Sequence, residues 1–207
     1  MSETTVGSPS VRLALPAEAP ALTEVQRRAW LADPALAEVV GALTPEEMTQ
    51  AWWTAITRPP MAEFRVLVAM DPGEEGPLVR GFAAIGPSED EDADPTDALV
   101  AEFVIDPDHR GQGHGSRLIN AVADTLRADR FTRATLWLRS TDDALRSFLT
   151  EAGWAPDGAH REAGTEDGRV HIKEIRLHSD IRSGDIRSGD ISSGDISSGD
   201  ISATDPD

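Results

Sequence analysis

The feature that most constrains the fold of this chain is a glycine-spaced loop within residues 104–116, VIDPDHRGQGHGS. A strand-like apolar run ends where the loop begins, and the loop opens directly into a helical pattern. Because Gly111, Gly113 and Gly115 lack a Cβ atom, backbone N–H groups can turn inward and approach a ligand closely. The first turn of the helix adds unpaired N–H donors and a partial positive charge. With the guanidinium of Arg110, these donors predict a binding site for an anion such as a pyrophosphate.

The pattern of apolar residues on both sides of this loop predicts strands with helices inserted between them. The strand-like runs cover residues 12–15, 64–70, 78–85, 98–105, 134–138 and 170–177. Helical patterns cover residues 18–31, a segment that starts after Thr44, another that starts near Ser116, and residues 144–152. Thr44 and Glu47 fit a capping box at the start of the second helix. We therefore expect an α/β (α+β layered) fold in one domain at residues 11–178, after a flexible N-terminus at 1–10.

The C-terminal residues 179–207 form a low-complexity Ser/Gly/Asp/Ile repeat. Its five-residue units begin at Ile181, Ile186, Ile191, Ile196 and Ile201. The spacing resembles the pentapeptide-repeat pattern, but one Ile per unit among Gly and Ser buries little apolar surface. We therefore expect a disordered tail.

Composition excludes several classes of partner and site. The 207 residues include 19 basic and 37 acidic side chains, a net charge of −18 that repels phosphate backbones and anionic lipid. We therefore expect neither nucleic acid nor a membrane as a partner. The chain has no cysteine, and its His, Asp and Glu residues lack metal-ligand spacing, so we expect no metal. Residues 1–15 lack the pattern of a signal peptide, which predicts a cytoplasmic protein.

Two common phosphate-binding motifs do not fit the glycine loop. A P-loop needs Gly-Lys-Ser/Thr, whereas the only lysine of this chain is Lys173. A dinucleotide fingerprint needs the spacing G-x-G-x-x-G, whereas here every second residue is glycine. Residues 110–115, RGQGHG, instead resemble the acetyl-CoA loop of the GNAT acyltransferase superfamily, Q/R-x-x-G-x-G/A.

The surroundings of the loop extend this resemblance over residues 11–178. Residues 105–107 are similar to the V-x-P strand end of the family, and residues 142–154 are similar to its N-x-x-A-x-x-F-Y-E-x-x-G-F helix. The resemblance implies a GNAT fold, with a mixed, mostly antiparallel central sheet flanked by helices. It also implies an N-acetyltransferase that uses acetyl-CoA as cosubstrate. The acceptor would be a primary amine of a small molecule or a protein N-terminus, attacking directly in a ternary complex.

The same resemblance implies where acetyl-CoA binds. In the family two central strands, here residues 98–105 and 134–138, splay apart around the pantetheine arm. Val104 and Ile105 would offer backbone groups to this arm, and an N–H near Ile105 would stabilise the oxyanion. Asp142 stands where the family has an Asn that contacts pantetheine, although it could equally cap its helix. The pyrophosphate would be held by Arg110, Gly111, Gln112, Gly113, His114, Gly115 and Ser116.

Glu102 is the candidate general base for the acceptor amine. Strict alternation would place Val100, Glu102 and Val104 on one face of the strand, and Leu99, Ala101, Phe103 and Ile105 on the other. Glu102 would then lie mid-strand beside the carbonyl site, unless it is only a solvated or ion-paired residue. Family members often carry this carboxylate a few residues earlier, where this chain has Asp97 and Leu99. The base is therefore Glu102 or Asp97, and we favour Glu102.

A tyrosine general acid is excluded, because the chain contains no tyrosine and Leu149 fills its usual position in the family. Ser147, Thr150 or water could protonate the departing thiolate, and we favour water. The missing tyrosine keeps open an alternative, a catalytically silent module that binds or senses acyl-CoA. The acidic run at residues 88–94 is either a solvated loop or an attractor of a cationic acceptor. The sequence leaves a homodimer open, and the acceptor walls at 18–60 and 156–170 carry no signature.

Overall fold

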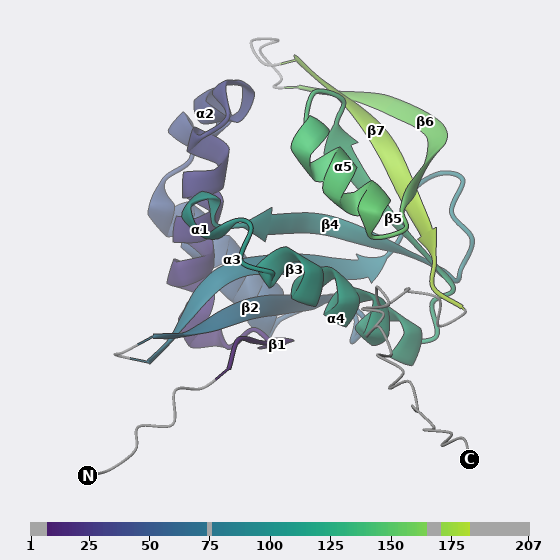
Figure 1. Ribbon diagram of the computed structural model, residues 1–207. Coiled ribbons are helices and arrows are strands. Elements are labelled where there is room, and N and C mark those ends of the chain that lie inside the picture. Colours follow the sequence, from purple (N-terminus) through teal and green to yellow (C-terminus); the bar gives the residue numbers. More distant parts are fainter. Residues whose placement is uncertain (1–7, 74–75, 165–170, 183–207) are drawn as a thin grey trace, which may run out of the picture.

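The computed structural model describes residues 8–73, 76–164 and 171–182 (Figure 1). Within these residues a single sheet has the strand order β1-β2-β3-β4-β5-β7-β6. Its strands are β1 (Ser10–Leu13), β2 (Arg65–Gly73), β3 (Gly76–Pro87), β4 (Asp97–Ile105), β5 (Arg133–Arg139), β6 (Ala155–Gly164) and β7 (His171–Asp180). Neighbouring strands run antiparallel except β4 and β5, which are parallel. This mixed, mostly antiparallel sheet confirms the predicted fold class.

Helices cover both faces of the sheet. They are α1 (Ala19–Leu31), α2 (Pro34–Gly41), α3 (Pro45–Thr57), α4 (His114–Ala128) and α5 (Asp143–Glu151), with 3-10 turns at Pro16–Glu18 and Pro107–His109. The larger core cluster joins α4 and α5 to one face, and the smaller one joins α1 and α3 to the other. In Figure 1, α4 and α5 lie in front of the sheet, and α1, α2 and α3 stand together at its left side.

The predicted helix patterns correspond to observed helices. The Thr44 hydroxyl accepts the Glu47 N–H at 3.2 Å, and the Glu47 carboxylate accepts the Thr44 N–H at 2.9 Å, so the capping box is confirmed. The buried residues of α4 follow the predicted stripe and include Leu118, Val122 and Leu126. Burial of this stripe holds the helix that begins at the glycine loop against the sheet.

Two elements, α2 and β6, were not predicted. Strand β6 reads APDGAHREAG, which has no alternation of apolar residues. It pairs only with β7, at the edge of the sheet, and an ion pair of 2.6 Å between Arg161 and Glu174 links the two strands. Backbone pairing with β7 and this ion pair therefore hold the strand in place. Neither of them produces a periodic pattern of apolar residues in the sequence.

A β-bulge in β4 changes which side chains share a face. Ala84 pairs with Glu102 and Ile85 pairs with Val100, so Ala101 is the extra residue. The bulge resets the alternation, because two residues of β4 oppose one of β3. Val100 therefore packs in the same core cluster as Phe103 and Ile105, and the predicted grouping of Val100 with Glu102 was wrong. Val104 packs in the opposite cluster, on the face that Glu102 shares.

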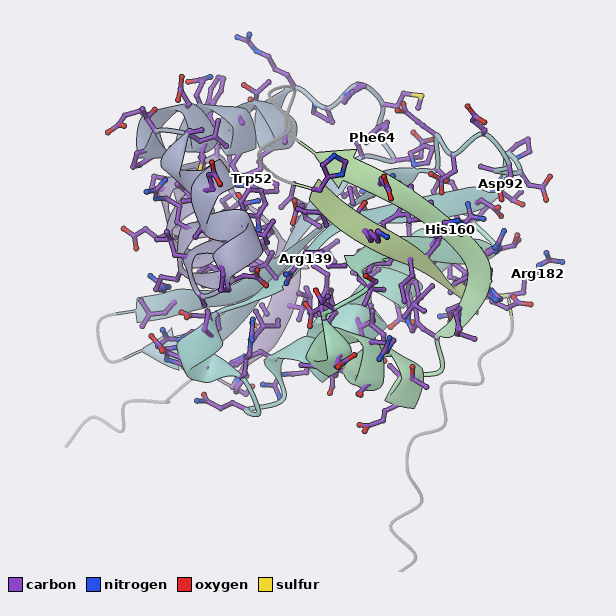
Figure 2. All side chains as sticks on the ribbon, turned by 90° about the horizontal axis from the view of Figure 1, so that it is seen from above. Trp52, Phe64, Asp92, Arg139, His160 and Arg182 are labelled. Carbon is purple, nitrogen blue, oxygen red and sulfur yellow. The ribbon has the colours of Figure 1, made fainter. Side chains whose placement is uncertain are left out.

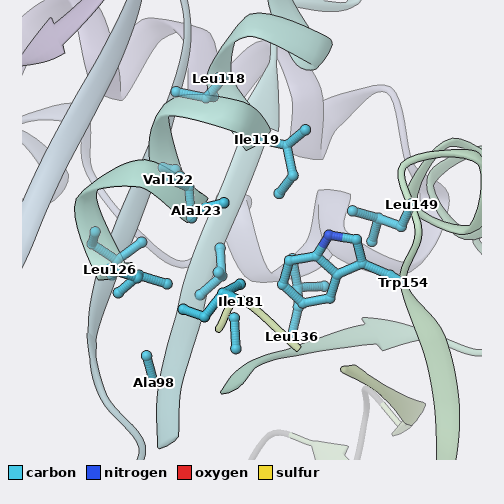
Figure 3. Packing of buried hydrophobic residues seen from close by; sticks show 14 of the residues in the cluster. Ala98, Leu118, Ile119, Val122, Ala123, Leu126, Leu136, Leu149, Trp154 and Ile181 are labelled. Atoms are coloured by element: carbon cyan, nitrogen blue, oxygen red, sulfur yellow. The ribbon is translucent and has the colours of Figure 1, made fainter. Parts of the chain in front are cut away.

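The folded part of the chain continues past residue 178. Strand β7 extends to Asp180, and Ile181, the first Ile of the repeat, is 3% exposed within the larger core cluster (Figure 3). The Ile181 N–H donates to the Thr132 carbonyl at 3.0 Å, and Arg127 donates to the Ile181 carbonyl at 2.9 Å. The expected boundary at 178 was therefore too early. The rest of the predicted tail, from 183, lies outside the described residues, as do residues 1–7.

Candidate functional site

A gap opens between the parallel strands β4 and β5. Their pairing runs from Asp97 with Arg133 to Val100 with Leu136 and goes no further along the described strands. Beyond it lies a cavity of about 210 Å³, which we call the gap cavity. It is lined by Ala29, Trp30, Leu36, Val100, Ala101, Glu102, Phe103, Val104, Leu136, Trp137, Leu138, Arg139, Asp142, Leu145, Ile172 and Glu174.

A second cavity, of about 360 Å³, lies at the glycine loop, and we call it the loop cleft. It shares Phe103 and Leu145 with the gap cavity, so the two cavities adjoin. Its lining residues are Phe103, Ile105, Arg110, Gly111, Gly113, Gly115, Ser116, Ala144, Leu145 and Phe148. The two cavities therefore lie side by side, one at the start of α4 and the other at the gap between the strands.

The backbone of the loop supports the predicted anion site. Gly111 and Gly113 have φ angles of +74° and +78°, a region in which a Cβ atom is strained, and Gly113 is the N-cap of α4. A Cβ atom on Gly115 would lie 3.2 Å from the Phe148 ring, so glycine is needed there for close packing. The stacked rings of Phe103 and Phe148, 5.9 Å apart between centroids, give the cleft an apolar wall. Free N–H groups at one end and an apolar wall at the other fit a pyrophosphate followed by a pantetheine arm.

Most of the predicted loop residues, but not all, line the loop cleft. Arg110, Gly111, Gly113, Gly115 and Ser116 do so. Gln112 and His114 are not among its lining residues. Arg117 donates to the Gln112 carbonyl at 3.0 Å, and the His114 ring is buried beside Arg117. Burial and then the Arg117 charge lower the pKa of His114, so its ring is favoured in the neutral form.

The backbone of Ile105 faces the gap. The N–H of Asp106 donates to the Arg80 carbonyl of β3 at 2.9 Å. Since successive N–H groups of a strand point to opposite edges, the N–H of Ile105 points away from β3, toward the edge that β5 has left. This is the edge at which the family resemblance places the thioester carbonyl. Val104 contributes to the gap cavity and Ile105 to the loop cleft.

Glu102 lies in the gap cavity without a partner. No residue that the structure describes donates a hydrogen bond to its carboxylate or forms an ion pair with it. Burial, and secondly the nearby charge of Glu174, raise the pKa of Glu102 to about 7. A carboxylate with this pKa can take a proton near neutral pH, as a general base must.

The other two predicted carboxylates are paired. Asp97 is 4% exposed at the start of β4, where it accepts from Arg133 at 3.3 Å. It does not line the gap cavity, so of the two candidate bases the structure places only Glu102 there. Asp142 lines the cavity, but it caps α5 by accepting the Leu145 N–H at 3.0 Å and also pairs with Arg139.

The acidic run at residues 88–94 makes contacts within the fold. Asp90 and Asp92 accept hydrogen bonds from Arg176 at 3.0 and 2.6 Å, and this hydrogen bonding lowers the pKa of Asp92 to about 2. Asp90 also accepts the Trp137 indole N–H at 3.1 Å. Arg176 is 5% exposed, so these contacts fix the loop to β7. Two carboxylates of the run are thus engaged within the fold, and one of them, Asp90, holds the Trp137 indole in place.

Sequence reasoning missed Trp137 and Glu174 as cavity residues. Trp137 lies between the core residues Leu136 and Leu138 of β5, and this alternation could have placed it on the opposite, cavity face. Glu174 pairs in register with Arg139, a long-range pairing that the sequence does not reveal. Figure 2 shows Arg139 between the helices α1 to α3 and the strands β6 and β7.

The tryptophans of α1 and α3 lie in three different surroundings. Trp30 lines the gap cavity. Trp52 donates to Gln26 at 2.8 Å and packs edge-on against Phe82 in the core. Trp53, 36% exposed, lies against Arg58 and outside the gap cavity.

Leu149, in the position where the family usually has tyrosine, is fully buried in the larger core cluster. It lines neither the loop cleft nor the gap cavity. The hydroxyl of Thr150 donates to the Arg146 carbonyl at 2.8 Å, so it is already engaged within α5. Among the described residues we find no grouping of three or more His, Asp or Glu able to hold a metal ion. No helix in the same part of the chain is long and apolar enough to span a membrane.

Comparison with known proteins agrees with this geometry. The model of the acetyltransferase (GNAT) family matches residues 22–154. A mycothiol acetyltransferase from Streptomyces scabiei is 37% identical over 73 residues. That alignment covers 35% of this chain and 22% of the relative, so the chain spans under a quarter of the relative's length.

Solved structures show the same fold at low sequence identity. An N-acetyltransferase from Staphylococcus aureus Mu50 superimposes with a TM-score of 0.67 at 16% identity, over 84% of this chain and 99% of that one. A putative acetyltransferase from Salmonella typhimurium, solved with its cofactor acetyl-CoA, gives a TM-score of 0.64 at 21% identity, over 84% and 95%. The family match covers more than half of the chain and includes the glycine loop, β4, β5 and α5. The chain therefore belongs to the GNAT family of acetyltransferases.

Proposed function

We propose that this protein transfers the acetyl group of acetyl-CoA to a primary amine by direct attack in a ternary complex. The observation that carries the proposal is the unpaired Glu102 carboxylate in the gap cavity, next to the loop cleft. A buried carboxylate is costly without a cation, and a bound ammonium group would supply one. Holding amine and thioester in adjoining cavities supplies much of the rate enhancement.

The chemistry begins with a proton on the acceptor. Glu102 takes one proton from the ammonium group, so that the nitrogen lone pair can form a C–N bond to the acetyl carbon. The N–H of Ile105 donates to the carbonyl oxygen as negative charge develops there. The C–S bond then breaks with its electron pair on sulfur, and the second nitrogen proton goes to that sulfur through water. The net products are the acetamide, CoA thiol and one proton released when Glu102 returns to the carboxylate.

The loop cleft holds the cosubstrate in this proposal. The N–H groups of Gly113, Gly115 and Ser116, together with Arg110, bind the pyrophosphate, and the Phe103–Phe148 wall contacts the pantetheine arm. Acetyl-CoA supplies the activated acyl group. No dedicated acid is required, because a thiolate is a good leaving group. The chain contains no tyrosine that could serve as that acid.

Calorimetric titration with acetyl-CoA tests the binding half of the proposal. We expect the wild type to bind and Gly113→Glu to lose binding, because a carboxylate would stand where the phosphates lie. Gly113→Ala is the matched control, since it carries the same strain at a φ of +78° without the charge. Binding by Gly113→Glu as tight as by Gly113→Ala would refute the loop assignment.

Release of CoA thiol in the presence of a panel of amines tests the catalytic half. Amine-dependent release by the wild type supports the transferase. Acetyl-CoA binding without release by any amine would favour the alternative, a catalytically silent acyl-CoA-binding module, for which the missing tyrosine is the supporting observation.

A further inference from the structure

The ionisable groups that line the gap cavity are mostly carboxylates. Four such groups line it, namely Glu102, Glu174, Asp142 and Arg139. Arg139 already pairs with Asp33 and Asp142, and so has little charge left to offer a ligand. The cavity is therefore negative overall, and a positively charged group is what it accommodates best.

Glu174 carries part of that negative charge. Its carboxylate pairs with Arg161 at 2.6 Å, but the Arg161 side chain is 48% exposed, which weakens the pair by solvent screening. Arg161 also stacks on the Trp137 ring at 4.3 Å. Glu174 thus remains a source of negative potential toward Glu102, consistent with its effect on the pKa of that residue.

The remaining wall of the cavity is mostly apolar. Trp30, Leu36, Leu138 and Ile172 contribute from α1, α2, β5 and β7. The one indole N–H on β5, that of Trp137, already donates to Asp90. Few unpaired polar groups are therefore available to hydroxyl or carboxylate groups of an acceptor.

We propose that the gap cavity accepts a primary amine on an apolar body, with no carboxylate beside the amine. This inference rests on the proposed acetyl transfer and names its acceptor class. A free amino acid would bring its carboxylate next to Glu102 and Glu174, where no described lining residue offers an unpaired cation. Burying that second charge without a partner opposes binding.

The size of the cavity limits what enters it. Its volume of about 210 Å³ lies below the roughly 300–1,000 Å³ of ordinary ligand pockets. Either a small amine or only the first residue of a peptide fits, and both have the same local chemistry, an ammonium group without an adjacent carboxylate. The experiment below separates these two sources.

Three compounds with the same benzyl group isolate the carboxylate, namely phenethylamine, phenylalanine and phenylalaninamide. We expect kcat/KM for phenylalanine to be about 100-fold or more below that of phenylalaninamide, measured by CoA thiol release. Phenethylamine and phenylalaninamide differ in amine basicity, so activity with both excludes basicity as the cause. A kcat/KM for phenylalanine within about tenfold of that for its amide would overturn the inference. The tripeptide Phe-Ala-Ala, compared with phenethylamine, shows whether the source is a peptide terminus or a free amine.

A variant that adds a cation to the cavity provides a second test. Leu36 is only partly buried on α2, so Leu36→Lys can be accommodated, and Leu36→Gln is a matched control without charge. We expect Leu36→Lys to raise the ratio of kcat/KM for phenylalanine to kcat/KM for phenylalaninamide by about tenfold. Leu36→Gln should leave this ratio unchanged. An unchanged ratio in Leu36→Lys, with activity retained, would count against the gap cavity as the acceptor site.

The two proposals fail in distinguishable ways. If acetyl-CoA binds but none of these compounds, nor any other amine, releases thiol, then the proposed transfer fails and the acceptor class falls with it. If phenylalanine and its amide react equally well, then the transfer stands and only the acceptor class is wrong.

Discussion

The two halves of strand β4 differ in how completely they are bonded to the rest of the sheet. Residues 98–100 have an antiparallel partner in β3 and a parallel partner in β5, and Asp97, just before them, pairs with β5. Residues 102–105, beyond the bulge at Ala101, keep only β3 among the described strands. The first three of them line the gap cavity, and Ile105 lines the loop cleft. The half with two neighbours fixes the sheet, and the half with one neighbour leaves backbone groups free for a ligand.

Each half carries one carboxylate, and the surroundings of the two differ in the same way. Asp97 is 4% exposed and accepts hydrogen bonds from Arg133 and from the Asp94 N–H. Glu102 has no such partner. A buried carboxylate costs free energy unless it is paired, so an unpaired one is most simply explained by a ligand that pairs with it. Asp97 is thus a buried acid with hydrogen-bond partners, and Glu102 is a partly buried acid of the cavity without one.

The largest effect should come from Glu102→Gln. We expect kcat at pH 8 to fall about 100-fold to 1,000-fold, because the amide keeps the shape of the side chain but cannot take a proton. The measurement is CoA thiol release with saturating acetyl-CoA and an accepted amine. Calorimetry should show acetyl-CoA affinity near that of the wild type, since Glu102 does not line the loop cleft.

Asp97→Asn is the matched control for this prediction. It removes the carboxylate of the other half of β4, and we expect kcat to stay within about threefold of the wild type below the melting temperature. Full activity of Glu102→Gln would remove Glu102 from the mechanism. Equal losses in both variants would mean that the two halves of β4 do not differ in function.

The next largest effect should be on stability, through Ile181. This residue packs in one core cluster with Leu126 and Trp154 (Figure 3). The cluster lies near the half of β4 that pairs with both β3 and β5. We expect Ile181→Ala to lower the free energy of unfolding in urea by about 2–4 kcal/mol, the range for an aliphatic core residue. Acetyl-CoA affinity of the folded variant should not change, because Ile181 lines neither the loop cleft nor the gap cavity.

Deletion of residues 183–207 is the control for Ile181→Ala, since it removes the other repeat units and retains the first Ile. We expect the free energy of unfolding to change by no more than about 0.5 kcal/mol. A loss similar to that of Ile181→Ala would show that the later units also contribute to the fold.

The glycine loop was predicted well because its constraints are local. Positive φ at Gly111 and Gly113 and the start of α4 depend on residues adjacent in sequence. The same is true of the capping box at Thr44. Motifs of this kind can be found without knowing which strands pair.

The acceptor side was predicted poorly because long-range pairing creates it. The bulge at Ala101 depends on the register of β4 with β3, and it places Val100 on a face that alternation does not predict. Glu174 reaches the cavity only because β7 pairs with β5. The identity of Glu102 as a candidate was available from the sequence, but its lack of a partner was not.

Removing the two carboxylates of β4 should change stability in opposite directions. The raised pKa of Glu102, about 7 against an ordinary 4.5, means that the folded state favours its neutral form. Its contribution to stability is complete below pH 4.5 and is lost as the pH rises to about 7. Above pH 7 we expect Glu102→Gln to be more stable than the wild type by roughly 1–3 kcal/mol.

Asp97→Asn should shift stability the other way, by roughly 1–2 kcal/mol, because it weakens the bonds to Arg133 and the Asp94 N–H. Urea unfolding of both variants at pH 5 and pH 8 measures the difference. A stabilised Asp97→Asn, or a destabilised Glu102→Gln at pH 8, would contradict the assignment of the paired and unpaired acids.

The smallest effect concerns the pH at which Glu102 loses its proton. Since a base acts in the deprotonated form, and kcat/KM reports ionisation of the free enzyme, kcat/KM should rise through about pH 7 in the wild type. Burial is the larger cause of the raised pKa and the charge of Glu174 the smaller, so Glu174→Gln should move the midpoint to lower pH by less than roughly one unit. Arg161, freed from its ion pair, would act in the same direction.

Glu174→Asp is the control for this last prediction, because it keeps the negative charge. Measuring kcat/KM for the amine, with acetyl-CoA saturating and the same amine for every variant, reports ionisation before the amine binds, and the titration of the amine is then common to all variants. A midpoint that moves to lower pH in Glu174→Gln but much less in Glu174→Asp would show that charge, and not the packing of β7, couples the two residues. An unchanged or raised midpoint in Glu174→Gln would mean that Glu174 does not act on Glu102, leaving burial in the half of β4 with one neighbour as the sole cause of the raised pKa.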